Sequence, residues 1–199
     1  MSSMRKNLLI SVWMTIATTI LLGIIYPLVV TGLAQLFFKD KANGQLIAQN
    51  GKVVGSRIIG QAFTGPAYFH SRPSAAGNGY DAANSSASNL APTNQHLIDR
   101  LKSDVAANQV DHPQQAVPVD LVTMSGSGLD PHISPAAAEF QIERVARVRG
   151  IGVDDLRQLM HKHTEGRQLG FLGEARVNVL ELNLDLDERF PFRKQAAVR

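Results

Sequence analysis

A long uncharged segment near the N-terminus most constrains what this chain can fold into. The 32 residues from Asn7 to Phe38 include no Lys, Arg, Asp, Glu or His. About 20 apolar residues in a helix cross the hydrocarbon core of a bilayer, and residues 8–30 meet that length. Trp13 and Tyr26 lie near the two ends, where interfacial aromatic side chains gather. The sequence therefore predicts a transmembrane helix at 8–30 that contacts the lipid bilayer.

The length of the apolar segment also argues against a cleaved signal peptide, whose apolar region runs about 7–15 residues. Cationic residues do not set the orientation, since Arg5 and Lys6 precede the segment and Lys39 and Lys41 follow it. Long domains are translocated largely regardless of charge, which favours an exterior C-terminal domain. We expect a cytoplasmic tail at 1–7, a juxtamembrane linker at 31–44, an extracytoplasmic domain at 45–190 and a tail at 191–199.

Composition excludes several classes of protein. The chain has no cysteine, so it has no disulfide framework, no cysteine-ligated zinc or iron–sulfur site and no cysteine nucleophile. The formal net charge is +3, but residues 39–199 hold 18 basic and 17 acidic residues. No long run of Lys and Arg is present to follow a phosphate backbone. Nucleic acid is therefore not expected as a partner.

Local signals after the membrane segment predict a small α+β domain. The Asn50-Gly51 pair between the apolar stretches 45–48 and 53–57 is typical of a type I′ hairpin turn, whose two central residues both need positive φ. Apolar spacing through Val105 predicts a helix capped by Thr93. The fold class is thus α+β: a single N-terminal transmembrane helix followed by one extracytoplasmic domain.

Two more helices and a strand are predicted towards the C-terminus. The Ser134-Pro135 pair is typical of a helix start, and Gly150 of its end. Another helix is expected to start at Asp154 or Asp155. Over 177–187 leucines alternate with polar residues, which predicts a strand with one buried face. The acidic residues of that strand's other face would be solvated or could bind cations, namely Glu181, Asp185 and Asp187.

Residues 74–91 form an unusual segment in which 15 of 18 residues are Ala, Ser, Gly or Asn. Such a segment has little apolar area to bury, so it is predicted to be a long loop. Two interpretations are open. The loop is either a flexible linker, or an ordered loop that Asn and Ser side chains hold by hydrogen bonds and that presents Tyr80 and Asp81 to a partner.

Candidate chemical motifs are weak. The residues Ser125, Gly126, Ser127 and Gly128 are a weak nucleotide candidate, because successive backbone N–H groups bind anions, but they lack a P-loop ending. Ser127, Asp130 and His132 are the residue types of a hydrolase triad, without the usual nucleophile elbow. His161 and His163 point apart on a helix, which argues against a metal pair. No arrangement supports a catalytic residue or a metal site.

Five motifs together resemble one protein family. They are residues 26–32 (Tyr-Pro-Leu-Val-Val-Thr-Gly), 68–74 (Tyr-Phe-His-Ser-Arg-Pro-Ser), 88–94 (Ser-Asn-Leu-Ala-Pro-Thr-Asn), 125–135 (Ser-Gly-Ser-Gly-Leu-Asp-Pro-His-Ile-Ser-Pro) and 141–146 (Gln-Ile-Glu-Arg-Val-Ala). In this order they are similar to the KdpC family, the C chain of the bacterial potassium-transporting ATPase. The resemblance covers nearly the whole chain up to about residue 190.

The resemblance implies a non-catalytic subunit of an ATP-driven potassium importer in the cell inner membrane, with its domain on the periplasmic side. Implied partners are a potassium-translocating channel-like chain, a P-type ATPase chain and a small fourth membrane chain. The family is also described as raising the ATP affinity of the ATPase chain, so ATP is expected only jointly with that chain. Residues of the motifs and of the loop are candidates for partner contact: Tyr68, His70, Arg72, Tyr80, Asp81, Asn89, Asn94, Asp130, His132 and Gln141. The alternative is an anchored periplasmic scaffold or binding domain that works without a pump.

Overall fold

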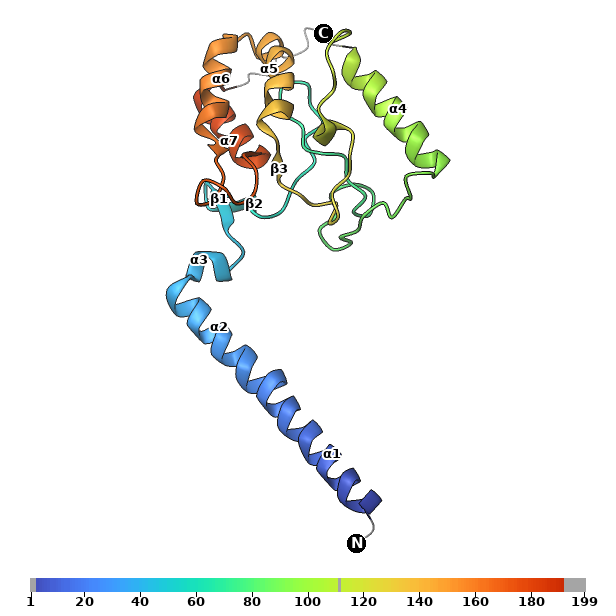
Figure 1. Cartoon of the computed structure of the whole chain (residues 1–199). Helices are drawn as coiled ribbons and strands as arrows, with labels where there is room; N and C mark the ends of the chain where they lie inside the picture. Colours follow the sequence, from blue (N-terminus) through green and yellow to red (C-terminus); the bar gives the residue numbers. More distant parts are fainter. Residues whose placement is uncertain (1–2, 111, 192–199) are drawn as a thin grey trace. The chain divides into compact units, whose positions relative to one another are not determined.

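The computed structural model describes residues 3–110 and 112–191, and it divides into two units, Met1–Leu46 and Ile47–Arg199. The first unit is a long helix made of α1 (Ser3–Ile20), a π-helical turn (Leu21–Ile25) and α2 (Tyr26–Phe37), followed by the short α3 (Lys39–Ala42) (Figure 1). The 35 residues of Ser3–Phe37 are long and apolar enough to cross a membrane. The helix therefore continues seven residues beyond the predicted end at residue 30.

Pro27 explains the π-helical turn inside this helix. Proline has no N–H, and its ring would clash with the carbonyl group four residues earlier in a regular α-helix. Just before Pro27 the helical turn contains one extra residue, so that the Tyr26 N–H donates to the Leu21 carbonyl oxygen five residues back. Thr15 and Thr18 donate their hydroxyls to backbone carbonyls one turn earlier, at 2.9 and 2.8 Å. These polar side chains are thus satisfied within the helix, as lipid requires.

The second unit combines short strands with four helices of ten or more residues. Its helices are α4 (Gln95–Gln109), α5 (Pro135–Arg149), α6 (Val153–Lys162) and α7 (Val179–Arg189), with a 3₁₀ turn at Val119–Leu121. The strands β1 (Leu46–Gln49) and β2 (Lys52–Ser56) form a hairpin. A second, antiparallel sheet has the order β3 (His132–Ile133), β5 (Arg176–Asn178) and β4 (Thr164–Glu165), with Ile133 and Thr164 both opposite Val177. The predicted α+β class is confirmed.

Several local predictions are confirmed and two caps need correction. Asn50 and Gly51 have φ of 52° and 76°, as a type I′ turn requires. Ser134 caps α5, and Gly150 ends it in the left-handed conformation at φ 69°. The α4 cap is Asn94, whose side chain accepts from the His96 N–H at 2.9 Å, and not Thr93. Helix α6 begins at Val153 after Gly152, which places the two predicted starting aspartates in its first turn.

The predicted strand at 177–187 is wrong beyond residue 178. β5 ends at Asn178, whose side chain accepts from the Glu181 N–H at 3.1 Å and so starts α7 as its N-cap. The buried positions Val179, Leu182, Asn183 and Leu186 then follow the spacing of three and four that a helix needs. Leu180, Leu182 and Leu186 are all buried in this helix, so the same leucines fit the buried face of a helix and the buried face of a strand.

The acidic residues of this segment are consequently paired rather than solvated on a strand. Three side chains surround Asp185 at 2.7–2.8 Å, namely those of Lys162, His163 and Arg189. Burial by itself raises the pKa of Asp185, but the hydrogen bonds from these three side chains outweigh it and hold that pKa well below its usual range. Glu181 pairs with Arg57, and Asp187 with Arg149, both at 2.7 Å.

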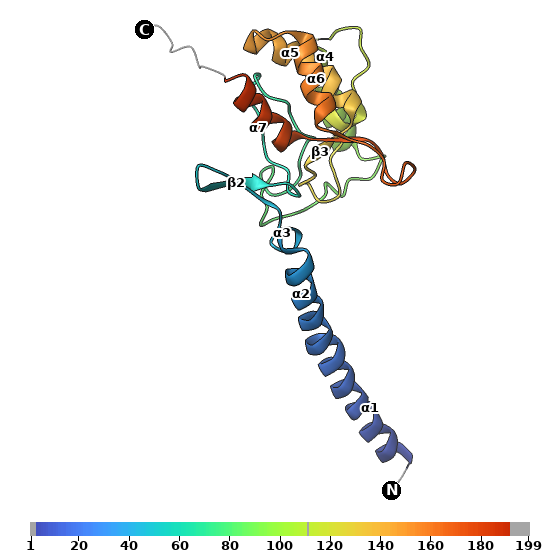
Figure 2. The same ribbon diagram turned by 90° about the vertical axis from the view of Figure 1, so that its left-hand side faces the viewer.

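The core lies where α5, α6 and α7 pack together beside the second sheet (Figures 1 and 2). Fully buried side chains from all three helices meet there, including Ile142, Leu156, Met160, Leu182 and Leu186. An extended segment before α4 contributes Phe69, which is completely buried. The core therefore includes a residue that comes from neither a helix nor a strand.

Two buried amide side chains hold that segment in place. Asn183 of α7 accepts from the Phe69 N–H and donates to the Phe69 carbonyl, both at 2.9 Å. Gln141 of α5 does the same for His70, at 2.7 and 3.1 Å. Asn183 and Gln141 are 1% and 4% exposed. The two helices thus replace the neighbouring strand that an extended segment would otherwise need.

Replacing Asn183 by Ala should unfold the domain at a distinctly lower urea concentration. The variant leaves the N–H and C=O of Phe69 buried without partners, which costs roughly 2–4 kcal/mol. Urea unfolding of the full chain in mild detergent, followed by circular dichroism, measures the loss. Gln115→Ala, at an exposed amide, is the control and should unfold like the parent chain. Equal midpoints for Asn183→Ala and the control would contradict the role of the clamp.

Candidate interaction site

The segment after His70 leads into a layer of two loops that hold each other. The Ser74 hydroxyl is the centre of the first contact. It donates to the Gly128 carbonyl at 2.5 Å and accepts from the N–H groups of Ala76 at 3.1 Å and Tyr80 at 2.9 Å. A second contact lies further along the same loop, where the Ser85 hydroxyl and the Ser86 N–H both donate to the Ser127 carbonyl, at 2.9 and 3.0 Å. The loop at 74–91 is therefore ordered, and serine hydrogen bonds hold it.

Gly128 lies where the two loops approach most closely. Its φ is 67°, and a Cβ atom there would lie 2.6 Å from the Ser86 carbonyl oxygen and 2.7 Å from the Ala76 nitrogen. Only glycine fits such a position. The turn itself closes by a hydrogen bond from the Gly128 N–H to the Ser125 carbonyl at 3.3 Å. The predicted nucleotide candidate, residues 125–128, is thus a tight turn packed against the long loop.

Arg72 ties this layer together. Its Nη1 lies 3.2 Å from Asp130 Oδ2, and its Nε and Nη2 donate to the carbonyl and hydroxyl of Thr123 at 3.3 and 3.2 Å. The Tyr80 hydroxyl donates to the Arg72 carbonyl. Burial raises the pKa of Asp130, but the hydrogen bonds from His132 and the charge of Arg72 outweigh it, so that the pKa lies below its usual value.

A hydrolase triad is not assembled among the described residues. Asp130 does meet His132, accepting from its N–H at 3.0 Å with His132 Nδ1 3.7 Å away. The Ser127 hydroxyl instead accepts from the Leu129 N–H at 3.1 Å, within its own turn. Within the same described ranges no group of three or more His, Asp or Glu side chains is placed to hold a metal ion.

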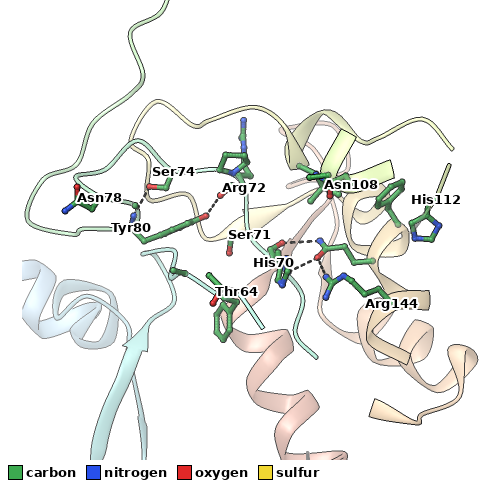
Figure 3. Close-up of a pocket in the computed structure, with 18 residues that line it drawn as sticks. Thr64, His70, Ser71, Arg72, Ser74, Asn78, Tyr80, Asn108, His112 and Arg144 are labelled. Atoms are coloured by element: carbon green, nitrogen blue, oxygen red, sulfur yellow. Dashed lines mark hydrogen bonds between the residues drawn. The ribbon is translucent and has the colours of Figure 1, made fainter. Parts of the chain in front are cut away.

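Beside this layer lies a cavity of about 600 Å³ (Figure 3). It opens between α4, α5 and the segment 62–80. Its polar lining includes His70, Arg72, Tyr80, Asn108, His112 and Arg144, and its apolar lining includes Phe63, Leu121 and Phe140.

Arg144 anchors one wall of the cavity. Its Nη1 donates to the carbonyls of Pro66 and Tyr68 at 2.6 and 3.0 Å, and its Nη2 to Gln141 Oε1 at 2.7 Å. Next to it, His70 Nε2 lies 2.9 Å from the Gly65 carbonyl oxygen. Burial lowers the pKa of His70, and the positive charge of Arg144 lowers it further.

The residues predicted from the sequence fall into three places. His70, Arg72, Tyr80 and Gln141 line the cavity, and Arg72 contacts Asp130, which in turn contacts His132. Tyr68 lies elsewhere, donating to Asp187 at 3.0 Å with the Arg149 guanidinium 4.7 Å from its ring centroid. Three residues belong to the loop and its end: Asp81 accepts from Ala83 and Asn84, Asn89 is exposed at φ 52°, and Asn94 caps α4.

Sequence reasoning missed most of the cavity lining, including Asn108, His112, Phe140 and Arg144. One signal was available, because Gln141 and Arg144 are three residues apart on a predicted helix and so share a face. His112 carried no local signal, since its place depends on how the chain returns after α4.

Replacing Gly128 by Ala should loosen the two loops. The added Cβ cannot fit against Ser86 and Ala76 at this positive φ, so we expect a loss of roughly 1–3 kcal/mol and faster cleavage within 74–91. Gly126→Ala is the matched control, because nothing lies within 4 Å of its added Cβ. Limited proteolysis with mass mapping of the fragments compares the two variants. Cleavage at the same rate in both would rule out this account of Gly128.

Comparisons with known proteins place the chain in one family. The family model described as "KdpC: K+-transporting ATPase, c chain" matches residues 8–188. A potassium-transporting ATPase KdpC subunit from Koribacter versatilis is 68% identical over 188 residues, which are 94% of this chain and 97% of that protein. The KdpC subunit of Rhodospirillum rubrum is 58% identical, covering 88% and 92%. That of Mycobacterium tuberculosis is 52% identical, covering 92% and 99%. The chain therefore belongs to the KdpC family, the non-catalytic accessory c chain of the K⁺-transporting ATPase.

Proposed function

We propose that this chain is a membrane-anchored docking subunit that assembles and stabilises a potassium-importing ATPase complex of the inner membrane. Its partners are the other Kdp chains: a potassium-translocating channel-like chain, a P-type ATPase chain and a small fourth membrane chain. Its N-terminus is a short cytoplasmic tail, and its domain lies on the periplasmic side. Family membership supports this role over that of an anchored scaffold or binding domain that works without a pump.

The observation that carries the proposal is the layer formed by the loops 74–91 and 123–130. The Ser74 and Ser85 hydroxyls donate to backbone carbonyls of the second loop, and Arg72, just before the first loop, donates to Asp130 in the second. The two loops are therefore held by bonds within this chain. Binding through a preordered surface loses less conformational entropy than binding through a flexible one. Exposed residues such as Asn89 and Ser127 are thereby held in fixed positions for contact with another chain.

The proposal assigns no ATP to this chain alone. A domain outside the cytoplasm does not meet cytoplasmic ATP, so an influence on the ATP affinity of the ATPase chain is transmitted through the assembled complex. Binding of ATP at residues 125–128 stays a prediction.

The orientation can be measured directly because the chain has no cysteine. We expect Gln115→Cys, on the exposed surface of the domain, to react with a membrane-impermeant maleimide in intact spheroplasts. Ser3→Cys, before the apolar segment, should react only after lysis. The opposite labelling pattern would place the domain in the cytoplasm and overturn this part of the proposal.

Assembly can be tested by co-purification from native membranes in mild detergent, with an affinity tag after Arg199. We expect the other Kdp chains in a fixed ratio to this chain. Gly128→Ala, which disturbs the loop layer, should recover at least fivefold less of them, while Gly126→Ala recovers the parent amount. Equal recovery with both variants would show that the loops do not take part in docking. Recovery of this chain without the other Kdp chains would contradict its role as a subunit of the pump.

A further inference from the structure

The π-helical turn in the apolar helix leaves one backbone carbonyl, that of Leu22, without a donor. In an α-helix this carbonyl would accept from the N–H of residue 26, and in a π-helix from that of residue 27. The Tyr26 N–H donates to Leu21 instead, and residue 27 is a proline, which has no N–H. Ile25 belongs to the π-helical turn, in which N–H groups bond five residues back and so past Leu22. The backbone of this helix therefore supplies no partner for the Leu22 carbonyl.

This carbonyl lies deep in the span. Leu22 is close to the middle of the apolar helix Ser3–Phe37, and no described residue of that helix is buried by the rest of the chain (Figure 1). The hydrocarbon core of a bilayer holds no water that could bond to the carbonyl, so an unpaired backbone acceptor there is costly. In membrane helices such an acceptor is satisfied by a hydroxyl side chain, by an ordered water or by a neighbouring helix.

The hydroxyl groups of this helix do not reach Leu22. Ser11, Thr15 and Thr18 donate to the carbonyl oxygens of residues 8, 11 and 14, at 2.8–2.9 Å. Serine and threonine in a helix bond backwards in this way, to a carbonyl three or four residues earlier. The same rule directs the Thr19 hydroxyl away from Leu22. A helix of another chain is the source of a donor that remains at this depth.

Gly23 leaves the Leu22 carbonyl accessible to such a helix. The Leu22 carbonyl carbon is bonded to the Gly23 nitrogen, so a side chain at residue 23 would stand beside the oxygen atom. A Cβ added to Gly23 would meet Thr19 Cγ2 at 3.9 Å, which is an ordinary contact, so the helix itself does not require glycine there. Membrane helices that pair use glycine where their backbones approach closely and use polar side chains to bond across the interface.

We propose that the π-helical turn at Leu21–Ile25 is a docking point for a transmembrane helix of another Kdp chain, and that a hydroxyl or amide side chain of that helix donates to the Leu22 carbonyl. Membership in the family of the K⁺-transporting ATPase c chain favours a different chain over a second copy of this one. The inference rests on the proposed role as a subunit. It adds a contact inside the bilayer to the docking of the loops 74–91 and 123–130.

Co-purification of the complex from native membranes in mild detergent tests this contact. Gly23→Leu places a side chain beside the carbonyl, and Pro27→Ala restores an N–H that lets the helix close regularly. We expect each variant to recover roughly threefold less of the other Kdp chains per copy of this chain, the effect of one typical hydrogen bond between membrane helices. Gly32→Leu is the matched control in the same helix, with nothing within 4 Å of its added Cβ, and should recover the parent amount. Resistance to extraction by alkaline carbonate shows that each variant is still inserted.

Photocross-linking of the assembled complex identifies the occupant. With p-benzoylphenylalanine in place of Leu22, we expect a cross-link to a membrane-spanning segment of another Kdp chain, mapped by mass spectrometry. The same probe in place of Ile24, two residues on and so on the other side of the helix, should give a much weaker cross-link.

The outcomes separate this inference from the subunit role. Parent recovery with Gly23→Leu or Pro27→Ala, an equal loss with Gly32→Leu, or cross-links only to lipid or to a second copy of this chain would each overturn the docking point. In all of these cases the parent chain still recovers the other Kdp chains. If the parent chain itself recovers none, the role as a subunit fails, and the docking point fails with it.

Discussion

The rest of the domain depends on two buried amide side chains, Asn183 and Gln141. Each makes a pair of hydrogen bonds to one backbone residue, Phe69 or His70, and so fixes an extended segment against α5 and α7. The position of this segment fixes the backbone of Arg72, two residues after His70. The Arg72 side chain in turn bonds to Thr123 and Asp130. The positions of the loops, the cavity and the candidate contact surface thus all depend on how Phe69 and His70 are held.

The two sides of that segment differ in how they are attached. On one side the helices α5, α6 and α7 bury leucine, isoleucine and methionine, which gives the core its apolar contacts. On the other side α4 has no buried residue. It is attached to the body by partly buried apolar side chains and by polar contacts such as that of Arg100 Nη1 with the Val122 carbonyl at 3.0 Å. The cavity opens on this less tightly packed side, where α4 and α5 line it together with the segment 62–80.

The sequence allowed prediction of features that depend on neighbouring residues. The turn at Asn50-Gly51, the start and end of α5 and the apolar membrane segment all follow from signals within a few positions. Helix α7 was predicted as a strand because its leucines fit a period of two, and only the Asn178 cap and the burial of Asn183 distinguish the helix. The sequence left open whether the loop at 74–91 is flexible or ordered, because the groups that hold it, at 127 and 128, lie 42 and 54 residues away. The same distance in sequence hid the cavity, which joins three separate segments.

The way the loop layer is attached has a consequence for temperature. Ser74, Ser85 and Ser86 hold the loop mainly by hydrogen bonds, with only Ala76 fully buried between residues 74 and 91. Hydrogen bonds form with a release of heat, whereas burial of apolar side chains weakens on cooling and has a large heat-capacity change. The loop layer and the helical core therefore respond differently to temperature: warming releases the loops while the three helices are still packed. The order of these loops at higher temperature is then set by their own local equilibrium, below the temperature at which the whole domain unfolds.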